Sequence, residues 1–138
     1  MKSWDELIPP EDNGREKFFG YLLRKPCTRQ QAKEYLSRMK FPDSLLDEAE
    51  DAGLIDDAAY ARLFAEGHVS WGNAKISHEL AMRGVSRENV RLALDEIADE
   101  PERAREIAES LRRSGVEERK IRARLMSRGF SGRVSLSE

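Results

Sequence analysis

The chain has 138 residues, with 24 Lys or Arg and 26 Asp or Glu, so its formal net charge is only −2. This balance argues against a protein that binds nucleic acid through overall positive charge, and the single cysteine, Cys27, excludes an internal disulfide framework. We find no signal-peptide pattern and no apolar run of about 18 residues, so we expect a soluble cytoplasmic protein that does not contact a membrane.

Apolar residues recur at helical spacing along nearly the whole chain, and no segment alternates with a period of two. The first predicted helix lies ahead of Pro26, and the second begins at Thr28, which can form a capping box with Gln31. Later apolar sets are Ala32, Tyr35, Leu36 and Met39; Tyr60, Leu63 and Phe64; Ile76 and Leu80; Ala104, Ile107, Ala108 and Leu111; Ile121 and Leu125. The pattern predicts an all-α protein.

Two passages of the sequence repeat each other. "KISHELAMRGVSRENV" begins at residue 75, and "KIRARLMSRGFSGRV" begins 45 residues later. A shift of 44 extends the match to an earlier copy and places Tyr60, Leu63 and Phe64 on Ala104, Ile107 and Ala108. A period of this length is typical of helical-repeat arrays, in which neighbouring units complete each other's core.

We therefore predict an elongated array of about three tandem three-helix repeats behind an N-terminal capping helix. Residues 1–27 form the tail and capping helix, 28–72 repeat 1, 73–116 repeat 2, and 117–138 a truncated repeat 3. Gly84 and Gly129 end the first helix of their repeats, where a left-handed residue is favoured. Lys40 stands at that place in repeat 1, so we expect its turn to be built differently.

Charge is unevenly distributed along the chain. Residues 43–57 contain seven acidic residues and no Lys or Arg, whereas residues 112–133 contain eight basic residues and two acidic ones. Lys120, Arg124 and Arg128 follow each other at four-residue spacing and would form one stripe on a helix. The stripe is either a solvated face or a surface for a negatively charged partner.

The passage "AGLIDDAAYARLF", residues 52–64, followed by "AKISHELAMRGVSRENVRLALDEI" and "RKIRARLMSRGFS", resembles the RecX family of bacterial RecA regulators. The resemblance covers about residues 14–134. It implies tandem three-helix repeats without a catalytic site. It also implies a protein that lodges in the groove of the RecA filament on single-stranded DNA and suppresses strand exchange and SOS coprotease activity.

With this resemblance, we predict that a basic surface contacts the filament, while contact with single-stranded DNA is indirect or weak and the protein is a monomer. The predicted contact residues are Lys75, Arg83, Lys120, Arg124, Arg128 and Trp71. For Trp71 we favour burial between units, and the alternative is stacking on a base or anchoring a protein partner.

Other functional classes find less support. His68, His78 and Cys27 lack the spacing of a zinc site, so we predict no metal and no cofactor. Glu79 beside His78 has no nucleophile motif or phosphate loop nearby, so we predict no enzyme. Two alternatives stay open: a helical-repeat adaptor unrelated to recombination, and a helix-turn-helix-like module that binds DNA.

Overall fold

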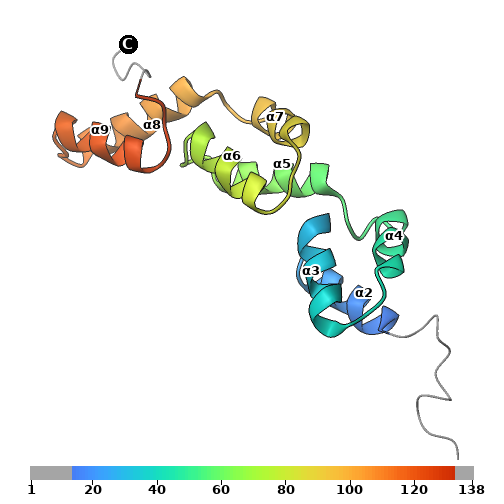
Figure 1. Cartoon of the computed structure of the whole chain (residues 1–138). Helices are drawn as coiled ribbons and strands as arrows, with labels where there is room; N and C mark the ends of the chain where they lie inside the picture. Colours follow the sequence, from blue (N-terminus) through green and yellow to red (C-terminus); the bar gives the residue numbers. More distant parts are fainter. Residues whose placement is uncertain (1–13, 133–138) are drawn as a thin grey trace, which may run out of the picture. The chain divides into compact units, whose positions relative to one another are not determined.

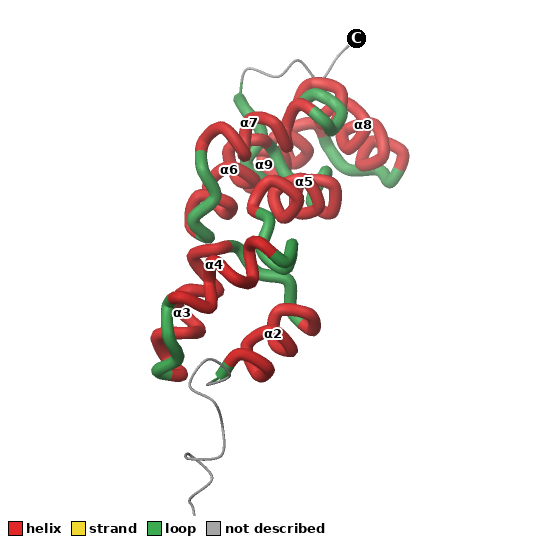
Figure 2. The backbone as a smooth tube through the Cα atoms, turned by 90° about the vertical axis from the view of Figure 1, so that its right-hand side faces the viewer, coloured by secondary structure: helices red, strands yellow, loops and turns green. Residues whose placement is uncertain are grey.

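The computed structural model describes residues 14–132, and every regular element in that range is a helix. Figure 2 shows these helices joined by loops and turns, with no strand in the described part of the chain. The eight helices are α2 (Arg15–Arg24), α3 (Arg29–Met39), α4 (Ser44–Asp51), α5 (Asp57–Gly67), α6 (Asn73–Met82), α7 (Arg87–Asp95), α8 (Glu100–Arg113) and α9 (Glu118–Ser127). The predicted all-α class is confirmed.

The chain divides into two compact units, Met1–Tyr60 and Ala61–Glu138. The first contains α2, α3 and α4, the second contains α6 to α9, and α5 begins in the first unit and continues in the second (Figure 1). No helix within residues 14–132 combines the length and apolarity needed to span a bilayer. The repeat boundaries stay a prediction, and the predicted tail and the last residues of repeat 3 lie outside the described residues.

The core of the first unit is rich in aromatic side chains. Phe18 and Leu22 of α2 are buried in one cluster with Tyr35 and Leu36 of α3 and with apolar residues of α4. The rings of Tyr21 and Tyr35 stack with their centroids 4.0 Å apart. Large rings bury much apolar area per residue, which stabilises a unit made of three short helices.

The same left-handed turn ends α3, α6 and α9. Lys40, Gly84 and Gly129 have φ values of 58°, 86° and 87°. The next residue donates its N–H to the carbonyl five positions back, Phe41 to Leu36 at 2.9 Å, Val85 to Leu80 at 3.0 Å and Phe130 to Leu125 at 3.1 Å. The expectation of a differently built turn at Lys40 is therefore wrong, because the following Phe41 packs on the core and holds Lys40 in the left-handed conformation.

The helices α2, α5 and α8 are related by a shift of 43 residues. Their buried pairs are Phe18 and Leu22, Ala61 and Ala65, and Ala104 and Ala108. The shift of 44 used for these helices in the sequence is wrong by one residue. It placed Leu63 in the core, whereas Leu63 is 63% exposed.

Carboxylates at the start of α5 and α8 cap two helices at once. Asp56 and Asp99 each accept an N–H within their own helix, from Ala59 at 3.1 Å and from Glu102 at 2.9 Å. The next residue caps a different helix: Asp57 accepts the N–H of Arg29 in α3 at 2.8 Å, and Glu100 accepts the N–H of Asn73 in α6 at 2.6 Å. These bonds satisfy donors that have no partner inside a helix.

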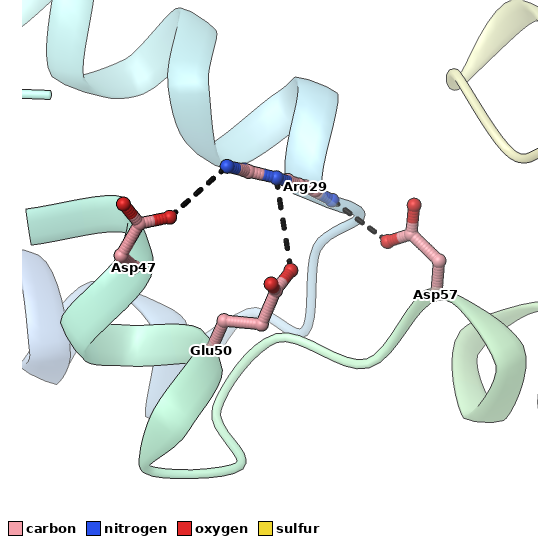
Figure 3. A network of polar contacts seen from close by, with 4 residues as sticks. All are labelled: Arg29, Asp47, Glu50 and Asp57. Atoms are coloured by element: carbon pink, nitrogen blue, oxygen red, sulfur yellow. Dashed lines mark hydrogen bonds and ion pairs between the residues drawn. The ribbon is translucent and has the colours of Figure 1, made fainter.

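The side chain of Arg29 joins α3 to α4, as Figure 3 shows. Its guanidinium lies 3.1 Å from Asp47 and 3.7 Å from Glu50, while its backbone N–H reaches Asp57. We call the Arg29, Asp47 and Glu50 ion pairs the Arg29 clamp. The clamp is partly exposed, so we expect it to orient the two helices more than it stabilises them.

We predict that Lys40→Gly raises the free energy of unfolding by about 0.5 to 1 kcal/mol, because glycine adopts a positive φ without the steric penalty of a side chain. Gly84→Ala places a side chain in the equivalent turn and should lower stability by about 1 kcal/mol. Urea unfolding of both variants measures the difference. A lower midpoint for Lys40→Gly would contradict the role assigned to this turn.

Candidate partner-binding surface

Arg103 of α8 organises the loop between α5 and α6. Its side chain is buried, although it is charged. The guanidinium donates to the carbonyl oxygens of Val69 (3.1 Å), Ala98 (2.7 Å) and Trp71 (2.9 Å), and to Oδ1 of Asn73 (2.9 Å). A planar guanidinium suits this task because its donors are fixed in one plane. The loop that carries Trp71 is therefore held at several points by one side chain.

Burial lowers the pKa of the Arg103 guanidinium, and the nearby Glu100 and Asp99 act in the opposite direction. An arginine starts from so high a pKa that it stays charged at neutral pH. The ring of Phe130 lies 5.7 Å from its central carbon, which adds a cation–π contact to the hydrogen bonds.

Glu100 extends this network to α9. One carboxylate oxygen accepts the N–H of Asn73, and the other accepts the N–H of Ser131 at 3.1 Å. The N–H of Gly72 donates to the carbonyl of Arg128 at 2.8 Å. The start of α6 and the end of α9 are thus bound to each other and to the start of α8.

Two glycines permit this close approach. A side chain at Gly72 would meet the carbonyl oxygen of Gly129 at 2.1 Å, and one at Gly129 would lie 2.5 Å from Cβ of Lys75. Both distances are too short for real contacts, so the backbones can meet only where no side chain is present. Lys75 and Arg128 consequently lie at the same junction.

The structure brings three predicted residues together in an aromatic column. The column consists of the rings of Phe64, His68 and Trp71, and the centroids of neighbouring rings are 4.2 Å apart. The three predicted residues are Trp71, which belongs to the column, and the cations Lys75 and Arg83, which flank it. Lys75 Nζ lies 4.3 Å from the centre of the Trp71 ring, and Arg83 Cζ lies 4.8 Å from that of Phe64. His68 Nδ1 lies 2.7 Å from the carbonyl oxygen of Phe64.

These contacts describe the surroundings of Trp71. The ring is half-buried and contacts Phe64 and His68 of the predicted repeat 1 and Lys75 of the predicted repeat 2, so burial between repeats stays a prediction. Contacts with His68 and Lys75 also leave less of the ring for a nucleic-acid base. The ring is in contact with the ammonium of Lys75.

The other three predicted residues lie on α9, which packs beside α8 (Figure 1). Lys120 and Arg124 are exposed and Arg128 is half-buried at the end of the helix, while Ile121 and Leu125 are buried against α8. Lys120, Arg124 and Arg128 are called the basic stripe. Within residues 14–132 no carboxylate forms an ion pair with any of the three.

Neighbouring basic residues differ in this respect. Arg112 pairs with Glu118, and this contact raises the pKa of Arg112 and lowers that of Glu118. Arg83 pairs with Glu79 at 3.0 Å. The basic stripe and Lys75, by contrast, have no carboxylate partner in the described residues.

Residues 56–94, which contain α5, α6 and nearly all of α7, match a family model described as RecX, second three-helix domain. The regulatory protein RecX of Thermobifida fusca is 34% identical over 90 residues, which cover 60% of this chain and 49% of that protein. The regulatory protein RecX of Mycobacteroides abscessus is 31% identical over 102 residues, covering 66% of this chain and 50% of the relative. The chain belongs to the RecX family.

Solved RecX structures have the same fold. The crystal structure of RecX from Lactobacillus salivarius superposes with a TM-score of 0.72 at 24% identity and covers 86% of both chains. A second RecX crystal structure gives a TM-score of 0.67, also at 24% identity, and covers 87% of this chain and 68% of that one. The present RecX-family chain spans about half the length of the curated relatives it matches.

Sequence reasoning missed Arg103 and Glu100. Both look like surface residues of an amphipathic helix, and arginine is rarely buried. A signal for Glu100 was available in the repeat: a shift of 43 residues places Glu100 on Asp57, and both carboxylates cap the start of another helix. No sequence signal singled out Arg103, because the corresponding position in α5 is Tyr60. Among residues 14–132 no cluster of His, Cys, Asp and Glu is arranged for a metal ion.

We predict that Arg103→Lys lowers the free energy of unfolding by about 2 to 4 kcal/mol, because lysine cannot serve all four acceptors from one planar group. Arg105→Lys is the matched control, since Arg105 is exposed on the same helix and should change stability by less than about 0.5 kcal/mol. Urea unfolding compares the two. Equal midpoints would show that the guanidinium network contributes little.

Proposed function

We propose that this chain is a non-enzymatic regulator that binds the RecA filament on single-stranded DNA and inhibits or remodels its recombination and SOS coprotease activities. Family membership supports this proposal, since the curated relatives are named regulatory proteins. In this proposal the chain acts as a monomer in the cytoplasm, where RecA filaments assemble. No step requires a cofactor.

The observation that carries the proposal is a group of cations of the second unit, the basic stripe and Lys75, that have no carboxylate partner in the described residues. The basic stripe places three positive charges on one helix, and Lys75 adds a fourth beside Arg128. Like charges at four-residue spacing repel each other by a few tenths of a kcal/mol per pair. A negative partner removes this repulsion. A nucleoprotein filament offers two such partners, the phosphates of the strand and acidic side chains of the recombinase.

The fold explains how these cations are presented. Ile121 and Leu125 pack α9 on α8, and the basic stripe runs beside that buried face with Lys120 and Arg124 exposed. Trp71 holds Lys75, and the Arg103 network holds Trp71. A surface that is ordered before binding loses less conformational entropy when it meets its partner.

We expect the protein to co-sediment with cognate RecA filaments on single-stranded DNA and to lower their DNA-dependent ATP hydrolysis at near-stoichiometric amounts. The control is bare single-stranded DNA at the same salt concentration, to which binding should be weak because the net charge is −2. An adaptor unrelated to recombination would give neither effect. Strong binding to bare duplex DNA in the same assay would instead favour the helix-turn-helix alternative.

Reversing the basic stripe should weaken filament binding. We predict that Lys120→Glu, Arg124→Glu and Arg128→Glu together lower affinity at least tenfold and reduce the salt dependence, because each lost phosphate contact removes about 0.7 from the log–log salt slope of a single strand. Affinity is measured by titration at two salt concentrations.

The matched control for the stripe reverses three cations of the first unit, Lys17→Glu, Arg24→Glu and Lys33→Glu. All three are exposed, and the total charge changes by the same amount. Thermal unfolding checks that both triple variants fold. An unchanged affinity for the stripe variant at both salt concentrations would assign the stripe to solvent, and equal losses in the two variants would show that only total charge matters.

A further inference from the structure

A groove of about 600 Å³ opens between α6 and α7 of the second unit. Its apolar lining comes from Ala81 and Val85 at the end of α6 and from Val90 and Leu94 of α7. Arg87 and Arg91 line it from the same side of α7. The volume lies within the range of ligand pockets, and it can take a few apolar side chains of a partner.

The first unit shows why the groove is open. A shift of 44 residues places Arg29 on Asn73, Asp47 on Arg91 and Glu50 on Leu94. The Arg29 clamp that joins α3 to α4 in Figure 3 is thus replaced by three residues that cannot form it. Arg91 pairs along its own helix instead, with Asp95 at 3.4 Å and with Glu88 at 3.9 Å.

Two charged positions of the groove have the opposite sign in the first unit. Asp43 and Asp47 of the first unit correspond to Arg87 and Arg91, and Glu34 corresponds to His78. Asp95 is the acidic residue of the lining, and it already pairs with Arg91. Arg87 has no ion pair with a carboxylate in the described residues.

We propose that this groove binds an acidic amphipathic helix of a protein partner. Apolar side chains at helical spacing would contact Val85, Val90 and Leu94, and carboxylates on the flanking positions would face Arg87 and Arg91. A nucleic-acid strand fits less well, because no Phe, Tyr or Trp lines the groove for base stacking and its floor is apolar.

The inference rests on the proposed function for the identity of the partner, which is then a recombinase subunit of the filament. The groove and the basic stripe lie on different helices, α6 and α7 against α9. A filament subunit would therefore be held by apolar contacts at the groove, while the stripe supplies attraction over longer distances. The two surfaces can be tested separately.

The first test fills the groove. Ala81→Trp adds a large side chain at an exposed position of the lining, so the core is unchanged. We expect at least tenfold weaker co-sedimentation with RecA filaments than for the wild-type chain. The control Ala58→Trp adds the same side chain at an exposed position of α5 and should bind like wild type.

A second variant tests the charge of the occupant. Arg87→Glu changes the first residue of α7, where a carboxylate is compatible with the helix dipole, so we expect it to fold. It should weaken filament binding at least threefold, and Arg105→Glu should not. If the wild type binds filaments and both Ala81→Trp and Arg87→Glu bind them equally well, the groove proposal is overturned and the proposed function stands. A wild-type chain that fails to bind filaments would overturn both.

Photo-crosslinking identifies what enters the groove. A photoreactive benzoylphenylalanine at position 81 should form a crosslink to the RecA polypeptide in the filament, within a segment that contains acidic and apolar residues. The same residue at position 58 is the control. A crosslink to DNA, or a RecA crosslink to a basic segment, would contradict the acidic-helix proposal.

Discussion

The fold depends on one interaction that recurs in both units, a carboxylate at the start of one helix that accepts the first N–H of another. Asp57 does this for α3 and Glu100 does it for α6. Helices of 8 to 14 residues are too short to be stable alone, so their ends must find partners outside the helix. The cap fixes where the first helix begins relative to the third, and the buried alanines of α5 and α8 then allow close packing.

The second unit adds a buried guanidinium to this plan. Removing a buried charge from its partners is strongly destabilising, so Arg103 fixes the loop that it binds. That loop carries Trp71, which contacts the ammonium of Lys75, and Lys75 lies against Gly129 at the end of α9. A structural network thus connects Lys75 to the end of α9, where Arg128 lies.

Much of this architecture could be predicted from periodicity. The helical class and the capping box of Thr28 and Gln31 are confirmed, and Leu80, Ile121 and Leu125 are buried as expected. The error at Lys40 arose because local preference was weighed without the packing of Phe41. The position of Arg103 could not be predicted, because three of its four acceptors are backbone carbonyls that any sequence would supply. The basic stripe was visible in the sequence, but its lack of carboxylate partners was not.

Comparison of the two units shows how a repeat can gain a surface at little expense in stability. A partly exposed ion pair contributes only about 0 to 1 kcal/mol, so the Arg29 clamp can be lost without unfolding a repeat. The buried positions are conserved in character between the units, with Leu46 and Ala49 of α4 matching Val90 and Ala93 of α7. Stability resides in those apolar positions, which leaves the charged positions around them free to change sign. In the first unit Asp47 and Glu50 are held by Arg29, whereas in the second unit Arg91 takes the place of Asp47 and lines an open groove beside Arg87.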